Sequence, residues 1–333
     1  MDHAARTAPR IGVLIAQLGT PQAPTPQALR PFLREFLSDR RVIDLPRWKW
    51  LPVLHLVVLR RRPARSAALY RNIWTPSGSP LMVYSQAQVA GVQERLDARY
   101  RVVLGMRYGH PSIACAIRSL VDEGVDRILV FSMFPQLSSS TTASIYDGVH
   151  RAVAACRRRV PTLRYVPPYF DDPLYVGALA ARVRAATAAA GGPPERHLFT
   201  FHGVPRRYVE EGDPYRQQCE ATARLLAEEL ALPRERWQCT FQSRFGREEW
   251  LEPYTDRALE ELGGHGVASL LVACPGFTAD CLETLDEIGR DGAGKFAAAG
   301  GGRMLLCPCL NDHPVWLDAM AAIVRRETAG WVD

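Results

Sequence analysis

Residues 199–205 read FTFHGVP and residues 14–21 read LIAQLGTP, so a strand-like apolar run followed by a glycine and a proline occurs twice. A second pattern also recurs. ILVFSMFPQLSSSTTAS (128–144) and LLVACPGFTADCLET (270–284) each lead from an apolar run through a proline loop into Ser, Thr or Asp residues before a helical pattern. The sequence therefore predicts two similar halves, with the change between them near residues 170–195.

Short apolar runs alternate with longer helical patterns along the chain. The strand-like runs are 11–19, 101–109, 127–135, 163–170, 197–203, 237–244, 269–277 and 304–310. Most are continuous, which is typical of parallel strands buried on both faces. The alternation predicts an α/β fold of two Rossmann-like, doubly wound halves. We expect an N-terminal half at 9–175, a C-terminal half at 176–310, and a C-terminal helix at 311–328 that packs back on the N-terminal half.

The composition is that of a soluble globular chain. Of 333 residues, 47% are hydrophobic and 23% are charged, and the formal net charge is +6. The basic residues are dispersed and show no nucleic-acid module, so an anionic small molecule or an anionic membrane surface is the expected partner. No signal-peptide core or membrane-spanning apolar run is present. We therefore expect a cytoplasmic location.

The eight cysteines include no C-x-x-C pair, which removes the main support for a zinc ribbon or a thioredoxin-like site. Cys307 and Cys309 could form half of an iron–sulfur site, but that needs two further thiolates nearby. Two buried core cysteines are the simpler interpretation.

Residues 47–66, RWKWLPVLHLVVLRRRPARS, are apolar and aromatic at first and strongly basic at the end. One interpretation is a core helix with a solvated basic end. The other is an interfacial segment that contacts anionic lipid or an amphipathic substrate, which would give peripheral membrane association.

His202 is a candidate functional residue because it stands at the predicted carboxyl end of a strand, next to a glycine that permits a sharp turn. Ligands bind at the carboxyl ends of strands in open parallel sheets, so the expected site is a cleft between the halves. A neutral imidazole there can accept a proton or bind a metal ion, although a lone histidine is often a core residue.

Glu283 and Glu287 are four residues apart, so a helix would place them on one face, and Asp286 could join them. Such carboxylates are usually a solvated surface, but in a cleft they could deliver a divalent cation or carry protons. Trp250 could form the wall of an aromatic pocket or belong to the core. Arg107 suits a carboxylate group of a ligand.

Taken together, these segments resemble the ferrochelatases, over nearly the whole chain. The matching segments are LGTP (18–21), FLREFLSDRRVIDLP (32–46), GSPL (78–81), MRYGHP (106–111), FPQLSSSTT (134–142), FTFHGVPRRY (199–208), QSRFGREEWLEPYTD (242–256), PGFTADCLETLDEI (275–288) and LNDHP (310–314). The resemblance implies a porphyrin cleft between two Rossmann-like halves. It also implies that Fe²⁺ enters a porphyrin and that two pyrrole protons leave.

The resemblance assigns roles to individual residues. It implies that His202 and Glu283 are catalytic and bind the metal, and that Glu287 extends a path for protons or metal. The implied porphyrin-binding residues are Leu18, Arg107, Tyr108, Trp250 and Phe277.

The chain departs from animal-type members of the family in two places. Cys281 stands where those members have a histidine, so no catalytic role is given to it. We expect no cysteine tail of the kind that holds a [2Fe–2S] centre in those members, and serine occupies a position near 138–140 where a cysteine is expected. No cofactor is therefore predicted, although Cys307 and Cys309 keep a [2Fe–2S] cluster as an alternative.

The predicted reaction is insertion of Fe²⁺ into protoporphyrin IX, the last step of haem biosynthesis. The alternatives are a coproporphyrin ferrochelatase, a tetrapyrrole carrier without catalysis, and a chelatase that inserts cobalt into an earlier tetrapyrrole. A dinucleotide enzyme is disfavoured because the first strand is followed by QLGTPQAP, not G-x-G-x-x-G. The oligomeric state cannot be predicted from the sequence.

Overall fold

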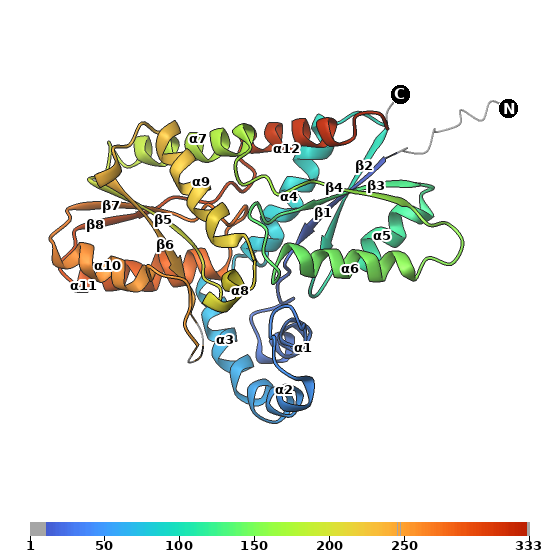
Figure 1. Cartoon of the computed structure of the whole chain (residues 1–333), viewed down its shortest axis with the longest axis horizontal. Coiled ribbons are helices and arrows are strands. Elements are labelled where there is room, and N and C mark those ends of the chain that lie inside the picture. Colours follow the sequence, from blue (N-terminus) through green and yellow to red (C-terminus); the bar gives the residue numbers. More distant parts are fainter. Residues whose placement is uncertain (1–10, 245, 247, 332–333) are drawn as a thin grey trace.

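The computed structural model describes residues 11–244, 246 and 248–331, and its strands form two four-stranded parallel sheets (Figure 1). The first sheet has the order β2-β1-β3-β4 and the second the order β6-β5-β7-β8. The strands are β1 (Ile11–Gln17), β2 (Tyr100–Met106), β3 (Arg127–Ser132), β4 (Thr162–Tyr165), β5 (Arg196–His202), β6 (Trp237–Gln242), β7 (Ser269–Ala273) and β8 (Arg303–Leu306). The predicted α/β class with two parallel-sheet halves is confirmed.

The second sheet repeats the first strand for strand. β1 pairs with β2 and β3, and β5 pairs with β6 and β7, so the two duplicated loops follow equivalent strands. The first turn needs its glycine, because Gly19 has a φ of +116° and a Cβ there would collide with the carbonyl of Tyr108.

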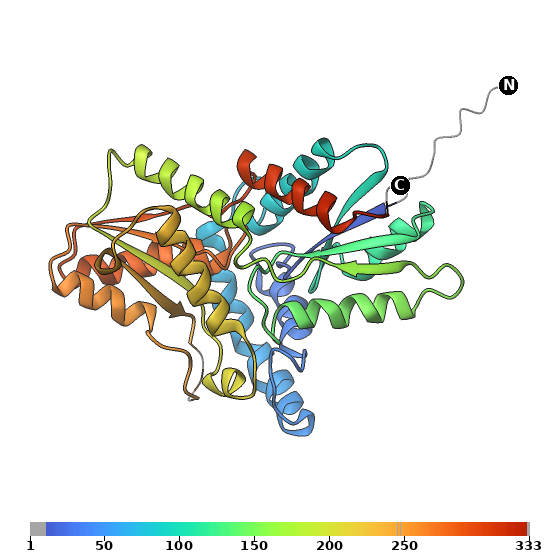
Figure 2. The same cartoon turned by 45° about the horizontal axis from the view of Figure 1, so that its top comes forward.

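Helices cover both faces of the sheets (Figure 2). Those of the first part of the chain are α1 (Pro26–Leu37), α2 (Arg47–Val53), the π-helix η1 (Leu54–Val58), α3 (Leu59–Ile73), α4 (Pro80–Arg95), α5 (Ile113–Asp122), α6 (Thr142–Ala154) and α7 (Pro173–Ala189). Those that follow are α8 (Arg206–Glu210), α9 (Tyr215–Glu229), the 3₁₀ turn η2 (Arg234–Arg236), α10 (Thr255–Gly264), the π-helix η3 (Glu283–Gly292), α11 (Ala293–Ala298) and α12 (Pro314–Glu327).

The last helix packs on the first part of the chain. α12 contacts α4 and α7, and the fully buried ring of Trp316 lies 6.5 Å from that of Phe131 on β3, between ring centroids. The domain limits expected at 175/176 and 310/311 have no separate test and stay predictions. Residues 9 and 10 lie outside the described residues.

The predicted basic and apolar segment is helical and projects from the body. α2, η1 and the start of α3 lie at the bottom of Figure 1, away from both sheets. Large apolar side chains are exposed there: Trp48 by 75%, Val53 by 44%, Leu56 by 58% and Val57 by 48%. In the described part of the chain, no helix is both long and apolar enough to cross a bilayer.

Candidate active site

His202 ends β5 and pairs in register with Gln242, the last residue of β6, so it lies at the carboxyl edge of the second sheet. The chain then turns at Gly203, whose N–H donates to the carbonyl of Gln242 over 2.7 Å. A Cβ at Gly203 would lie 2.9 Å from that oxygen and 3.2 Å from the ring of Trp250. Only glycine fits the turn, which explains why it directly follows the histidine.

The hydrogen bond of His202 defines its tautomer. Nδ1 lies 2.7 Å from the carbonyl oxygen of Gly203. A carbonyl only accepts, so Nδ1 carries the hydrogen and donates it. In the neutral ring, Nε2 therefore keeps its lone pair, which can accept a proton or bind a metal ion.

Trp250 lies beside this imidazole. The two ring centroids are 6.4 Å apart, and Trp250 is half-buried. A β-bridge to Pro205 and a hydrogen bond from the N–H of Leu251 to the carbonyl of Val204 hold the segment against the turn after β5. The histidine and an aromatic wall are thus fixed by one local structure.

Glu283 and Glu287 lie on η3, a π-helix of ten residues. π-Helices are rare and occur mostly as single turns, often at functional sites. Gln242 Nε2 donates to the carbonyl of Glu283 over 3.1 Å, which ties the start of η3 to the strand end beside His202.

The expectation that Asp286 joins the two glutamates is wrong. Its carboxylate accepts from Asn72 Nδ2 at 2.8 Å and from Arg290 Nε at 2.7 Å, on the side of η3 that packs on α3. A π-helix has more residues per turn than an α-helix, so Asp286, three residues after Glu283, lies on a different face from Glu283.

Glu287 is a half-buried residue whose Oε2 accepts a short hydrogen bond from Ser243 Oγ, 2.6 Å long. Burial raises the pKa of Glu287, with a further upward contribution from the charge of Glu283. The hydrogen bond of Ser243 and the charge of His202 act in the opposite direction. His202 and Glu283 therefore both lie close enough to Glu287 to influence its pKa.

Ser243 was missed by the sequence analysis. It has a φ of 66°, a left-handed backbone that is uncommon for serine. This conformation aims its hydroxyl at Glu287. Glu287 also lines a cavity of about 220 Å³ with Asp256, Asp291 and Lys295, so the carboxyl faces a second group of charged side chains.

Two residues of α3 were also missed. Arg62 is half-buried, and this burial lowers its pKa, while the Glu283 carboxylate opposes that shift. Burial and then the charge of Glu283 raise the pKa of Tyr70, and the nearby Thr20 hydroxyl opposes this shift. The two are eight residues apart, about two helical turns, so the helical period places them on one face. The helical spacing of Arg62 and Tyr70 was the sequence signal that could have identified them.

The predicted porphyrin ligands Arg107 and Tyr108 belong to another cluster. Arg107 Nη2 lies 2.5 Å from Asp39 Oδ2, and Tyr108 donates its hydroxyl to the same oxygen over 2.8 Å. Ser144 also donates to it, at 2.6 Å. Burial raises the pKa of Asp39, but these hydrogen bonds and Arg107 outweigh burial and lower it overall.

The ring of Tyr108 is only 1% exposed, and Leu18 packs in the same apolar cluster. Arg107 already has an internal carboxylate partner. The roles predicted for Leu18, Arg107 and Tyr108 toward a porphyrin have no test here and stay predictions.

Phe277 lies between two apolar clusters, one of which contains Leu81, Tyr84 and Cys281. Cys281 is buried, and burial followed by the neighbouring Glu283 raises the pKa of its thiol. Cys307 and Cys309 are buried free thiols. Within residues 11–244, 246 and 248–331, no group of three or more His, Cys, Asp and Glu side chains is arranged to hold a metal ion.

A family model described as Ferrochelatase matches residues 10–328, which is nearly the whole chain. The chain belongs to the ferrochelatase family. Curated relatives carry the name over the same extent. The protein named Ferrochelatase from Azoarcus sp. is 50% identical over 325 residues, covering 97% of this chain and 89% of the relative. The protein named Ferrochelatase from Alcanivorax borkumensis is 46% identical over 327 residues, covering 97% of this chain and 95% of the relative.

Solved structures agree on the fold. SirB from Bacillus subtilis with Fe³⁺ superposes with a TM-score of 0.58 at 13% identity, covering 96% of each chain. CbiX, described as the terminal enzyme for biosynthesis of sirohaem in denitrifying bacteria, superposes with a TM-score of 0.51 at 17% identity, covering 95% of this chain and 98% of that one. As a member of the ferrochelatase family, the chain is a metal chelatase, a lyase whose substrates are a porphyrin and Fe²⁺.

Proposed function

We propose that this chain inserts Fe²⁺ into protoporphyrin IX to form protohaem, the last step of haem biosynthesis, with His202 and Glu283 as the catalytic residues. The observation that supports these two residues most is the fixed tautomer of His202 beside Glu283 and Glu287.

The reaction needs a base. A free porphyrin carries two N–H protons at its centre, and Fe²⁺ replaces both, so two protons must leave for each iron that enters. Nε2 of His202 accepts a pyrrole proton, because Nδ1 is held by the carbonyl of Gly203. The imidazolium that forms is stabilised by the neighbouring carboxylates Glu283 and Glu287.

Glu287 then carries the proton away from the porphyrin, which returns Nε2 of His202 to its neutral form so that it can accept the second pyrrole proton. Its raised pKa makes it a better proton acceptor than an ordinary carboxylate. It borders the cavity that also contains Asp291, which gives the proton a route along η3. Fe²⁺ can follow the same carboxylates in the opposite direction, with Glu283 and the neutral Nε2 of His202 as its ligands at the stages when Nε2 carries no proton.

The porphyrin must also be distorted, since a planar macrocycle hides its nitrogen lone pairs. We expect Trp250 and Phe277 to contact the ring and hold it out of plane, using binding energy from the rest of the ligand. Arg62 on α3 is a further candidate for a propionate, because its guanidinium lies near Glu283.

We further infer that α2 and η1 touch a membrane surface. Trp48, Val53, Leu56 and Val57 are exposed on a helical projection that also carries Arg60 and Arg61. An apolar face flanked by basic residues is typical of an interfacial helix. This segment favours protoporphyrin, whose vinyl groups are apolar, over coproporphyrin, which has more carboxylates.

The experiment is an anaerobic comparison of the two porphyrins. Purified protein is mixed with Fe²⁺ and either protoporphyrin or coproporphyrin, and the change from free porphyrin to metalloporphyrin is followed by absorbance. We expect a higher kcat/KM for protoporphyrin. A higher value for coproporphyrin would assign the coproporphyrin reaction, and tight binding of both without insertion would assign a carrier.

A further inference from the structure

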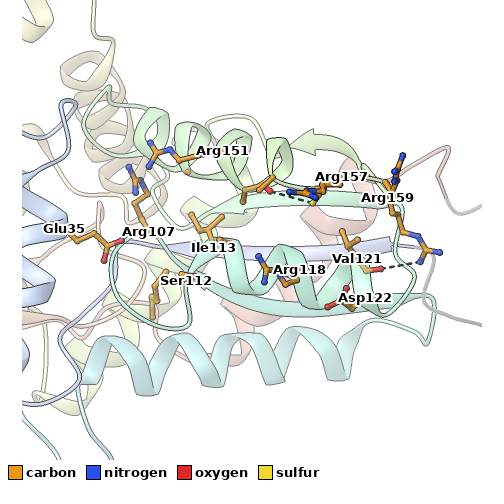
Figure 3. Close-up of a pocket in the computed structure, with 17 residues that line it drawn as sticks. Glu35, Arg107, Ser112, Ile113, Arg118, Val121, Asp122, Arg151, Arg157 and Arg159 are labelled. Carbon is orange, nitrogen blue, oxygen red and sulfur yellow. Dashed lines mark hydrogen bonds between the residues drawn. The ribbon is translucent and has the colours of Figure 1, made fainter.

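A basic groove lies on the first sheet's outer side, away from His202. It is a hollow of about 860 Å³ along α5 and α6 (Figure 3). Small residues of and after α6, Gly148, Ala152 and Ala155, line it, and with the half-buried Val121 they form its apolar floor. We call this hollow the α5–α6 groove.

Arginine dominates the lining. The basic residues are Arg107, Arg118, Arg151, Arg157, Arg158 and Arg159, and the acidic ones are Glu35 and Asp122. Figure 3 shows the labelled guanidinium groups spread along the groove, from Arg107 and Arg151 at one end, through Arg118, to Arg157 and Arg159 at the other. The positive charge therefore follows the whole length of the groove.

Most of this charge is not neutralised by the residues that the structure describes. Arg118, Arg151, Arg157 and Arg158 are exposed, and none of these four has an ion pair or hydrogen bond with another described residue. Some exposed arginines elsewhere have an ion pair one helical turn away, as in Arg206–Glu210, Arg216–Glu220 and Arg224–Glu228. Four unpaired guanidinium groups around an apolar floor are complementary to an anionic, amphipathic occupant.

The shape of the α5–α6 groove favours a helix over a flat membrane surface as the anionic occupant. α5 has ten residues and α6 has thirteen, which correspond to about 15 and 20 Å of helix. A groove of that length between two helices suits a third helix laid along it. A flat bilayer fits a concave surface poorly, and the exposed apolar side chains that suit a membrane lie on the separate projection of α2 and η1.

We propose that the α5–α6 groove docks an acidic amphipathic helix of a partner protein. The apolar face of that helix packs on Val121 and Ala152, and its flanking carboxylates pair with Arg118, Arg157 and Arg158. The proposal does not depend on the chemistry at His202. A second copy of this chain is a poor occupant, because its net charge of +6 would repel the groove.

The test uses a fluorescent synthetic helix of about four turns, with leucines on one face and glutamates beside them, titrated by fluorescence anisotropy. The double variant R118E/R158E reverses two groove charges. Its control is R30E/R303E, which makes the same change in net charge at exposed residues outside the groove. We expect at least roughly tenfold weaker binding for R118E/R158E and less than about twofold change for the control.

A second variant separates docking from simple attraction of charge. Ala152→Phe fills the groove without changing any charge, and we expect it to weaken binding by a similar factor while iron insertion, measured on the same samples, stays at the wild-type rate. Equal affinity of R118E/R158E and the wild type would overturn the proposal, as would no binding by the wild type up to about 100 µM peptide. Unchanged binding by Ala152→Phe would also overturn it, because the attraction would then not involve the groove.

Anionic vesicles address the lipid alternative. If R118E/R158E loses binding to vesicles of phosphatidylglycerol and phosphatidylcholine but keeps its affinity for the peptide, the groove is a lipid contact and the proposal is wrong. We expect vesicle binding to be the same for R118E/R158E and for R30E/R303E.

Discussion

Nδ1 of His202 donates a 2.7 Å hydrogen bond to the carbonyl oxygen of Gly203, the residue that follows it in the chain. The base and its orienting acceptor are therefore adjacent in sequence, and the turn that joins them also seats Trp250. The orientation of the imidazole thus depends on Gly203, because its carbonyl accepts the hydrogen bond and a larger residue would not fit the turn.

Gly203→Ala should destabilise the protein and displace the turn. The new Cβ would lie 2.9 Å from the carbonyl oxygen of Gln242, which is backbone and cannot move aside cheaply. We expect a loss of about 1–3 kcal/mol in the free energy of unfolding, measured by urea denaturation, and slower iron insertion. The control is Gly177→Ala in α7, where nothing lies within 4 Å, and which should be neutral or slightly stabilising.

Glu287→Gln should stabilise the protein while slowing insertion. The folded pKa of Glu287 lies above its ordinary value of 4.5, so the folded state binds this proton more tightly than the unfolded chain does. Stability from this group is therefore present at low pH and falls as the pH rises from about 4.5 through the raised folded pKa. The gain in Tm of the variant should be larger at pH 8 than at pH 5; an equal gain at both would contradict the burial effect.

Asp39→Ala should be strongly destabilising. It removes the carboxylate that pairs with Arg107, and the side chains of this pair are only 9% and 8% exposed. An uncompensated buried guanidinium costs about 3–5 kcal/mol, measurable by chemical denaturation. Asp147→Ala breaks the Arg41 pair, whose side chains are 39% and 40% exposed, and should cost less than about 1 kcal/mol. Similar losses for both would mean that the Asp39 network is not a buried charge pair.

Replacing Trp48 and Leu56 together by serine should weaken binding to anionic vesicles, because both side chains are mostly exposed on α2 and η1. The measurement is co-sedimentation, with insertion into detergent-solubilised porphyrin as a check of the fold. Val315→Ser is the control, since Val315 is exposed by 42% on α12, at another part of the molecule. If the double variant sediments with vesicles as the wild type does, membrane contact does not involve this segment.

The sequence predicts the architecture because buried parallel strands leave a direct signal, the continuous apolar run, and because each duplicated loop follows an equivalent strand. His202 could be placed at a strand end for the same reason. The resemblance to a family then added Glu283 and Glu287 as its partners.

Features that depend on distant contacts could not be predicted. Arg107 contacts Asp39, which is 68 residues away in the sequence. The guanidinium that was expected to bind a carboxylate of the ligand therefore pairs with a carboxylate of the protein itself. Nothing in residues 283–292 distinguishes a π-helix from an α-helix, and this difference turns Asp286 toward Asn72. Ser243 carries no sequence signal, because its role follows from a left-handed backbone that only the fold imposes.

The most direct test of the central claim compares His202→Ala with the wild type under anaerobic conditions, with protoporphyrin and Fe²⁺, by following haem formation and porphyrin binding in parallel. The account predicts that the wild type forms haem, and that His202→Ala binds porphyrin with similar affinity but forms essentially none. Haem formation by His202→Ala at the wild-type rate would contradict the assignment of this imidazole as the base.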